Sequence, residues 1–79
     1  MIVPILAFGI AKEITGKQKL NIDIEKDTTI KQLREVLCSK YKKLSTIPFL
    51  VAVNDAYAKD KKKLRDGDEV AIIPPTNGG

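Results

Sequence analysis

The sequence predicts an α+β domain in which a mixed sheet of four to five strands carries one main helix on one face. Two observations support this class: several short β-branched runs flank a single long amphipathic stretch, and 79 residues leave room for only one domain. A chain of this length buries only roughly 60% of the surface that its unfolded form exposes. A deep cleft built wholly within the chain is therefore not expected.

The first two strands are expected at Ile2–Phe8 and Gln18–Ile24. The first is a continuous apolar run, and the second alternates strictly between polar and apolar residues, which is typical of a half-buried strand. Between them, Gly9–Gly16 is expected to be a loop or one helical turn that ends at a glycine. The two strands would pair antiparallel.

The main helix is expected to begin at Thr29, which forms a capping box with Gln32. Cys38 is interpreted as a small buried hydrophobe, because the chain contains no histidine that could activate it as a nucleophile. The helical region ends at Ile47-Pro48. Apolar residues at spacings of three and four form one stripe on a helix of about 15 residues: Ile30, Leu33, Leu37, Tyr41 and Leu44.

Three further strands are expected at Phe49–Val53, Ala56–Lys59 and Glu69–Ile73. Asn54-Asp55 and Asp66-Gly67-Asp68 provide the turns, and two prolines stop the last strand because neither can donate a ladder hydrogen bond. The connections place the first and last strands side by side and parallel at the centre of the sheet, an arrangement called a β-grasp.

The composition limits the chemistry that the chain can perform alone. It has no histidine and one cysteine, so it lacks the commonest general base and cannot form an intrachain disulfide or a Cys-x-x-Cys site. We expect no metal site and no bound cofactor. The apolar N-terminal residues carry no basic region and are interpreted as a strand, so we expect a cytoplasmic protein without a membrane partner. The formal net charge is +4, but no aromatic residue interleaves with the lysines, which favours a solvated basic surface over nucleic-acid binding.

Both central strands are apolar on both of their faces, although the chain has only one long helix to cover them. The second face is therefore either covered by loops or exposed as an apolar patch that marks a protein partner. Strand parity assigns this face to Leu6, Phe8, Ala71 and Ile73.

The chain ends in Pro74-Pro75-Thr76-Asn77-Gly78-Gly79. The prolines favour a stiff, extended exit from the sheet, and the last four residues reach roughly 13–14 Å when extended. Glycines lack a Cβ atom and can pass through a channel that excludes other residues. A frayed terminus is the alternative interpretation. We divide the chain into a domain of residues 1–73 and an extended flexible tail of residues 74–79.

The stretch Asp66–Gly79 resembles the C-terminal signature of the small subunit of molybdopterin synthase, which typically reads DGDEVA, two apolar or aromatic residues, Pro-Pro, two variable residues and Gly-Gly. Weaker similarity covers the rest of the chain: Phe8–Gly16, the helix from Thr29 to Tyr41, and Val51–Asn54. The resemblance implies a ubiquitin-like β-grasp fold and a sulfur carrier.

In that family, a ubiquitin-activating-like adenylyltransferase adenylates the C-terminal glycine with MgATP, and sulfur from a donor protein then replaces one carboxylate oxygen. The resemblance implies that a thiocarboxylate at Gly79 gives its sulfur to cyclic pyranopterin monophosphate in the large subunit, during molybdenum cofactor biosynthesis. It also implies a heterotetramer, and a tail of Thr76, Asn77 and Gly78 that reaches the active site. The carrier is non-catalytic alone, and MgATP serves the activating enzyme.

The partner surface is expected around the exit of the tail. Tyr57 aligns with a family position that contacts the large subunit, and strand parity adds the apolar residues near it. The expected interface residues are Leu6, Phe8, Tyr57, Ile73, Pro74 and Pro75. Two alternatives stay open, because they share the Gly-Gly end: a sulfur carrier for thiamine or another thiolated product, and a ubiquitin-like protein modifier.

Overall fold

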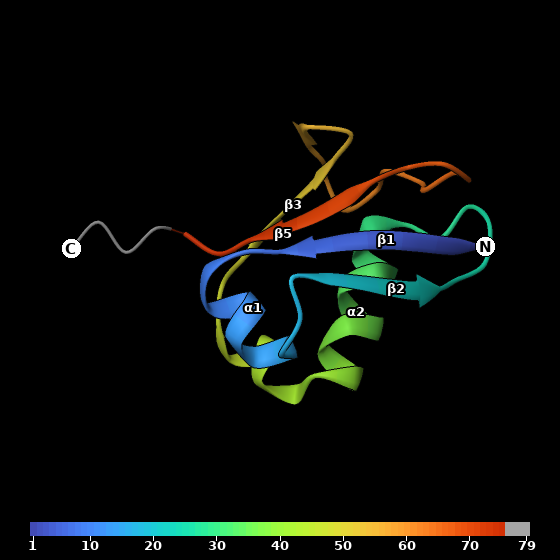
Figure 1. Ribbon diagram of the computed structural model, residues 1–79. Coiled ribbons are helices and arrows are strands. Elements are labelled where there is room, and N and C mark those ends of the chain that lie inside the picture. Colours follow the sequence, from blue (N-terminus) through green and yellow to red (C-terminus); the bar gives the residue numbers. More distant parts are fainter. Residues whose placement is uncertain (76–79) are drawn as a thin grey trace.

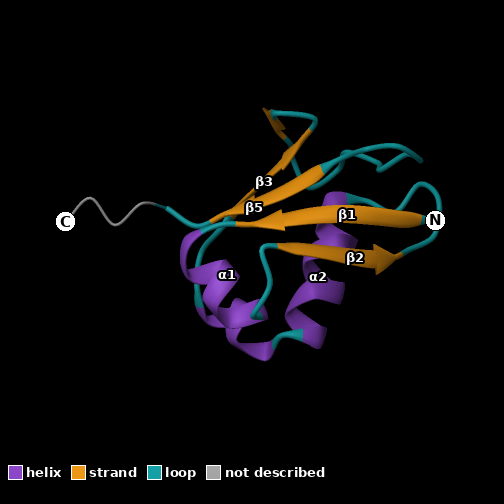
Figure 2. Ribbon diagram, viewed as in Figure 1, coloured by secondary structure: helices purple, strands orange, loops and turns teal. Residues whose placement is uncertain are grey.

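A computed structural model describes residues 1–75 as a five-stranded mixed sheet with its helices on one face (Figures 1 and 2). The sheet order is β2-β1-β5-β3-β4, in which β1 and β5 are parallel and the other neighbours antiparallel. This is the ubiquitin-like β-grasp that the sequence predicts, with the first and last strands adjacent. The elements are β1 (Ile2–Ala7), α1 (Gly9–Thr15), β2 (Lys19–Asp23), α2 (Ile30–Lys40), the 3₁₀ helix η1 (Lys42–Thr46), β3 (Leu50–Val53), β4 (Ala56–Tyr57) and β5 (Val70–Ile73).

The core lies between the sheet and α2, as the alternation of the strands predicts. The residues of β1 and β5 that face the helix are at most 1% exposed, and the helical stripe meets them with side chains that are fully buried. Burial of each large aliphatic side chain contributes roughly 1.5–3 kcal/mol to folding. The central members of this core are Val3, Ile5, Ala7, Ile30, Leu33, Leu37, Leu44, Val70 and Ile72.

The main helix starts as predicted but ends earlier. Thr29 Oγ1 accepts a hydrogen bond from the Gln32 N–H (3.2 Å), and Gln32 Oε1 accepts one from the Thr29 N–H (2.9 Å), so the capping box is confirmed. The prediction of a helix of about 15 residues is wrong, because Tyr41 is extended and η1 follows it. The hydroxyls of Ser45 and Thr46 donate to backbone carbonyls three residues earlier, which favours a tight turn over a continuing α-helix.

The segment after β1 forms more helix than the sequence predicts. Instead of a loop or one turn, α1 spans seven residues and buries Ala11 completely. It ends at Gly16, as expected, because Gly16 adopts the left-handed conformation (φ 75°) and donates its N–H to the Lys12 carbonyl (2.8 Å). This short helix covers the part of the core that α2 does not reach.

The four C-terminal residues Thr76, Asn77, Gly78 and Gly79 lie outside the described residues. The predicted division of the chain into residues 1–73 and 74–79, and the role of each tail residue, therefore stay predictions. Within the described part, the chain leaves β5 at Ile73 and continues through Pro74 and Pro75 away from the sheet (Figure 1).

Candidate functional site

The face of the sheet away from the helices is open. The strand registers place Leu6 beside Ala71, Ala71 beside Ala52, and Ala52 beside Tyr57, so that one apolar row crosses four strands. Phe8 is 43% exposed and Tyr57 is 70% exposed. Of the predicted patch residues, Phe8 is exposed and Leu6, Ala71 and Ile73 are half-buried, so this face remains accessible to a partner, which favours the patch over the interpretation that loops cover it. We call this surface the open face: Leu6, Phe8, Leu50, Ala52, Tyr57, Ala71 and Ile73.

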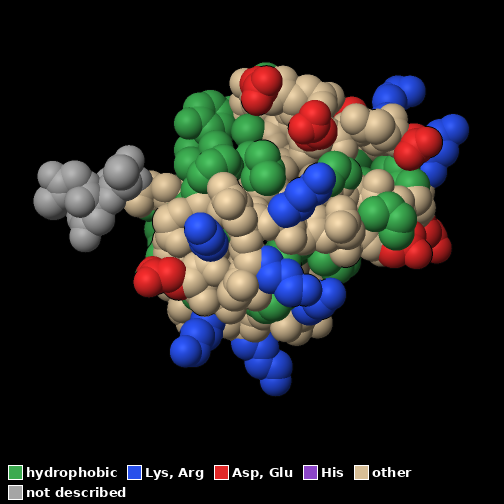
Figure 3. Space-filling model, in the orientation of Figure 1, with side chains coloured by type: hydrophobic (Ala, Val, Ile, Leu, Met, Phe, Trp, Pro, Cys, Tyr) green, Lys and Arg blue, Asp and Glu red, His purple; other side chains and the backbone are tan. Residues whose placement is uncertain are grey.

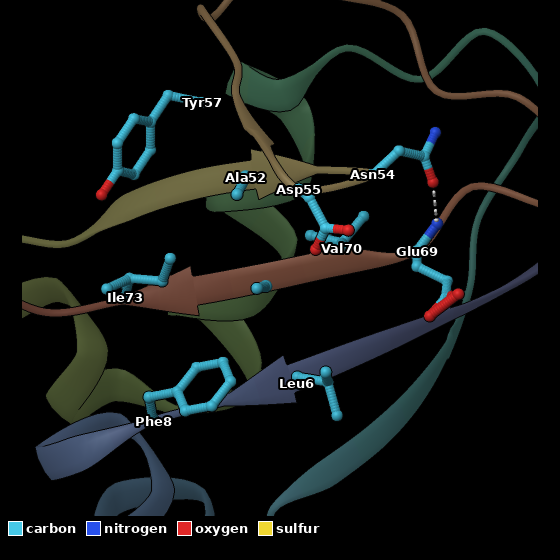
Figure 4. A pocket seen from close by; sticks show the side chains of 10 residues that line it. Leu6, Phe8, Ala52, Asn54, Asp55, Tyr57, Glu69, Val70 and Ile73 are labelled. Atoms are coloured by element: carbon cyan, nitrogen blue, oxygen red, sulfur yellow. Dashed lines mark hydrogen bonds between the residues drawn. The ribbon is translucent and has the colours of Figure 1, made fainter.

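A groove of about 460 Å³ runs along the open face. Phe8, Ile73 and Tyr57 stand at one end of it, near the end of β5, while Asn54, Asp55 and Glu69 lie at the other (Figure 4). Figure 3 shows hydrophobic side chains gathered beside the point where the described chain ends, with lysines and arginines spread over other parts of the view. An apolar groove with one polar end is suited to binding a protein segment, because burying its aromatic rims is favourable.

The structure brings together four of the predicted interface residues. Leu6, Phe8, Tyr57 and Ile73 all line the groove, although they come from β1, β4 and β5 and the segment that follows β1. Pro74 and Pro75 do not line it but extend the chain from its edge.

Gly9, the first residue of α1, lies close to Pro74, the first residue after β5. A Cβ atom at Gly9 would lie 3.9 Å from Pro74 Cγ, and its φ of 54° is left-handed, so a glycine suits this position. The start of α1 therefore lies close to Pro74, where the chain leaves the sheet.

Sequence reasoning missed Leu50. This residue is 52% exposed, and the register of β3 with β5 places it beside Ile73 on the open face. Every residue of the predicted strand Phe49–Val53 is apolar, so its sequence does not show that Leu50 faces outward between the buried residues Phe49 and Val51. Phe49 is the buried neighbour: its ring lies 4.6 Å from the Arg34 guanidinium carbon, and Arg34 Nη2 donates to its carbonyl (2.8 Å).

The polar end of the groove is a hydrogen-bonded corner between two segments that carry the family resemblance. Asn54 Oδ1 accepts from the Glu69 N–H (3.0 Å; Figure 4), and Asn54 Nδ2 donates to Asp68 Oδ1 (2.9 Å). Asn54 and Asp55 both have positive φ, which the β3–β4 turn requires. These bonds fix β4, and with it Tyr57, relative to the start of β5, so the corner shapes the groove.

Asp68 has a lowered pKa. The main cause is the hydrogen bond that its carboxylate accepts from the Arg65 N–H (2.8 Å), and the second is the hydrogen bond that it accepts from Asn54 Nδ2. A depressed folded-state pKa stabilises the fold above the ordinary value of 3.8, and that stabilisation is lost as the pH falls through the folded pKa. We expect Asp68→Ala to lower the free energy of unfolding near neutral pH by on the order of 1 kcal/mol. The difference from the parent should shrink below pH 3.8.

Urea denaturation at a series of pH values measures this difference, with Asp66→Ala as the matched control, because Asp66 is exposed in the same turn. A gap between Asp68→Ala and the parent that persists unchanged in acid would contradict the proposed role of the ionised carboxylate.

The described residues supply little chemistry of their own. Across residues 1–75, no three His, Cys, Asp or Glu side chains gather where they could hold a metal ion. Cys38 is half-buried and packs against the core, in agreement with its interpretation as a small hydrophobe. None of the helices in this range is long and apolar enough to cross a membrane.

The fold and the open face define a β-grasp protein that presents an apolar sheet face beside its C-terminal exit. The chain belongs to the ThiS family, whose model matches residues 5–79. The molybdopterin synthase sulfur carrier subunit of Caenorhabditis briggsae is 35% identical to it, over 98% of this chain and 96% of the relative. The proteins of the same name in Caenorhabditis elegans and Arabidopsis thaliana are each 32% identical to it over 98% of this chain. The resemblance to the small subunit of molybdopterin synthase is therefore confirmed.

Two solved structures place the fold in context. A complex of subunits 1 and 2 of the molybdopterin-converting factor from Helicobacter pylori contains a chain that is 28% identical, with a TM-score of 0.69 over the whole of both chains. The small archaeal modifier protein 1 of Haloferax volcanii is 21% identical, with a TM-score of 0.83 over 94% of this chain and 97% of that one. The second likeness concerns the fold alone.

Proposed function

We propose that this chain is the sulfur carrier subunit of a molybdopterin synthase. The observation that carries the proposal is the position of the groove: its apolar rim of Phe8, Tyr57 and Ile73 lies at the end of β5, from which the Gly-Gly tail continues. A partner seated on the open face would receive the C-terminus directly. The similarity to named carrier subunits over nearly the full chain supports the same assignment.

The proposed reactions require no catalytic side chain on the carrier itself. A carboxylate is a poor acyl donor until it is converted to a mixed anhydride. We therefore propose that an adenylyltransferase first joins the Gly79 carboxylate to the AMP part of MgATP and releases pyrophosphate. Hydrosulfide supplied by a donor protein then attacks the carbonyl carbon, AMP leaves with one of the carboxylate oxygens, and loss of the sulfur-bound proton gives the thiocarboxylate. The chain has no histidine and needs none, because the acids, bases and MgATP site of these steps belong to its partners.

The partner proposed for the open face is the large subunit of the synthase, in a heterotetramer. The likeness to a chain in a two-subunit complex from Helicobacter pylori supports such a partner. Burial of Phe8 and Tyr57 would supply aromatic anchors of the kind that dominate binding energy at interfaces. Leu50 joins the interface proposed from the sequence, because it extends the open face beside Ile73. We place these reactions in the cytoplasm.

Reconstitution tests the function. The thiocarboxylated chain, mixed with a molybdopterin synthase large subunit and cyclic pyranopterin monophosphate, is expected to yield the dithiolene-bearing pterin and to return a C-terminal carboxylate. Parallel reactions with a thiazole synthase and with lysine-containing target proteins separate the two alternatives. Sulfur delivered only to the thiazole synthase, or an isopeptide bond formed in place of sulfur transfer, would overturn the proposal.

A further inference from the structure

Within residues 1–75, the sheet has one long unpaired edge. Its order ends in β4, which has two residues, and in β2, which has five. The Ile24 N–H donates to the Met1 carbonyl and the Ala7 N–H donates to the Gln18 carbonyl, so the even-numbered residues of this segment face β1. Lys19, Asn21 and Asp23 therefore direct their backbone groups outward, and no strand within residues 1–75 pairs with them. An open row of this length is a template for a further strand.

The side chains along this edge are self-complementary. Every second residue from 17 to 25 is exposed, and the series begins with two lysines, has Asn21 at its centre and ends with two acidic residues: Lys17, Lys19, Asn21, Asp23 and Glu25. A second copy that runs antiparallel, with the two Asn21 residues opposite each other, places Lys19 beside Asp23 and Lys17 beside Glu25. The same pairs recur on the other side of the two-fold axis.

The backbone favours the same register. Residues 19, 21 and 23 are the ones that face outward, and this register sets each of them opposite an outward-facing residue of the second copy. Antiparallel pairs of this kind exchange two hydrogen bonds each, about six in all. Leu20 would lie opposite the second copy's Ile22 on the helix side, so the two cores would also meet. A shift by one residue would turn each side chain toward the wrong face.

The charge pattern is compatible with the contacts already present at this edge. Asp23 Oδ1 accepts a hydrogen bond from the Met1 ammonium (3.2 Å), whereas its Oδ2 has no partner among residues 1–75. Lys19 lies beside Leu6, at the end of β1 where the chain turns into α1. A lysine of the second copy can therefore pair with Asp23 without displacing Met1.

We propose that the β2 edge binds a second copy of this chain, to form a two-fold dimer with one sheet running through both molecules. The open face stays accessible on both copies, since no residue of β2 lines its groove. Because β2 of the second copy runs in the opposite direction, the two C-terminal exits lie toward opposite ends of the shared sheet. Exposed ion pairs add to the backbone hydrogen bonds at this edge, so the dimer is expected to be weakened by salt.

Sedimentation equilibrium with charge-sorted variants tests the proposal. One variant carries Lys17→Glu and Lys19→Glu, and the other carries Asp23→Lys and Glu25→Lys. Each variant alone sets like charges opposite each other and is expected to dimerise at least about tenfold more weakly than the parent. The two variants mixed in equal amounts restore opposite charges at all four positions and are expected to form a heterodimer.

Two further variants control this test. Asn21→Pro removes an N–H that faces outward, which an edge strand tolerates, and is expected to give a monomer with the circular dichroism spectrum of the parent. Lys61→Glu alters an exposed lysine outside the paired segment of residues 17–25 and should leave the dimer unchanged. A parent that stays monomeric at millimolar concentration in low salt, or a variant mixture that forms no heterodimer while both variants are folded, would overturn the proposal.

Discussion

Deleting Gly79 is expected to abolish sulfur transfer completely while leaving the domain as stable as the parent. The reacting group in the proposed function is the α-carboxylate of Gly79, and removing this residue moves the carboxylate back by one residue, about 3.5 Å along an extended chain. The structure places the core between residues 3 and 72, so the deletion removes no core contact. Pterin formation in the reconstituted synthase and thermal unfolding of the free chain measure the two effects separately.

A substitution at Gly78 separates the effect of side-chain size from the effect of chain length. Gly78→Val keeps the chain length and the terminal carboxylate but adds a β-branched side chain. We expect it to weaken transfer by steric exclusion from the partner's channel, with an unchanged unfolding temperature. Pterin synthesis by the Gly79 deletion at the rate of the parent would show that the tail is not the carrier.

The second large effect is expected on the open face, where Phe8→Lys should break the complex with the large subunit. Phe8 is 43% exposed in the free chain, so a lysine there reaches water without disturbing the core. In the complex, the loss of an aromatic anchor costs about 2 kcal/mol or more, which is at least about a 30-fold loss of affinity. Ile73→Lys is expected to act in the same way, because it faces the same groove. A pull-down with the large subunit measures binding.

Lysine substitutions at three positions on α2 show how the same charge acts in the core and on another exposed surface. Leu37 is fully buried, so Leu37→Lys should unfold the domain by placing an unpaired ammonium in the core, and Leu33→Lys should do the same. Val36, next to Leu37 but 41% exposed, should accept lysine with the fold and the complex intact. Circular dichroism separates these outcomes. If Phe8→Lys unfolds, or binds as tightly as the parent, the open face is not the partner surface.

Most of the fold follows from local patterns, because each pattern reports a physical requirement of a single element. The alternation in β2 and in β1 predicts correctly which residues face the helices and which face away from them. The reciprocal hydrogen bonds of Thr29 and Gln32 fix the start of α2. The end of α2 was harder to predict, since Leu44 satisfies the helical spacing and is fully buried, yet it reaches the core from a 3₁₀ helix. Periodicity alone cannot distinguish these two routes to the same buried position.

The candidate site needed information that no single segment contains. Strand parity predicts that Phe8 and Ile73 share a face, but the place of Leu50 beside Ile73 depends on the register between β3 and β5. The side-chain hydrogen bond between Asn54 and Asp68 joins the same two parts of the chain, although these residues are 14 positions apart in sequence. The tail, in contrast, was predicted from its own residues and from the family signature. Its proposed function depends on the length of the extended chain and on the small size of the two glycines, and not on packing against the domain.

The central claim is that Gly79 carries sulfur as a thiocarboxylate, and an intact mass measurement tests it most directly. The chain is incubated with a cognate adenylyltransferase, MgATP and a sulfur donor, and fragmentation then locates any change in mass. We predict a gain equal to the exchange of one oxygen atom for one sulfur atom, confined to Gly79 and dependent on ATP. A sulfur atom added to Cys38 instead, as a persulfide, or no ATP-dependent gain at Gly79, would contradict the account.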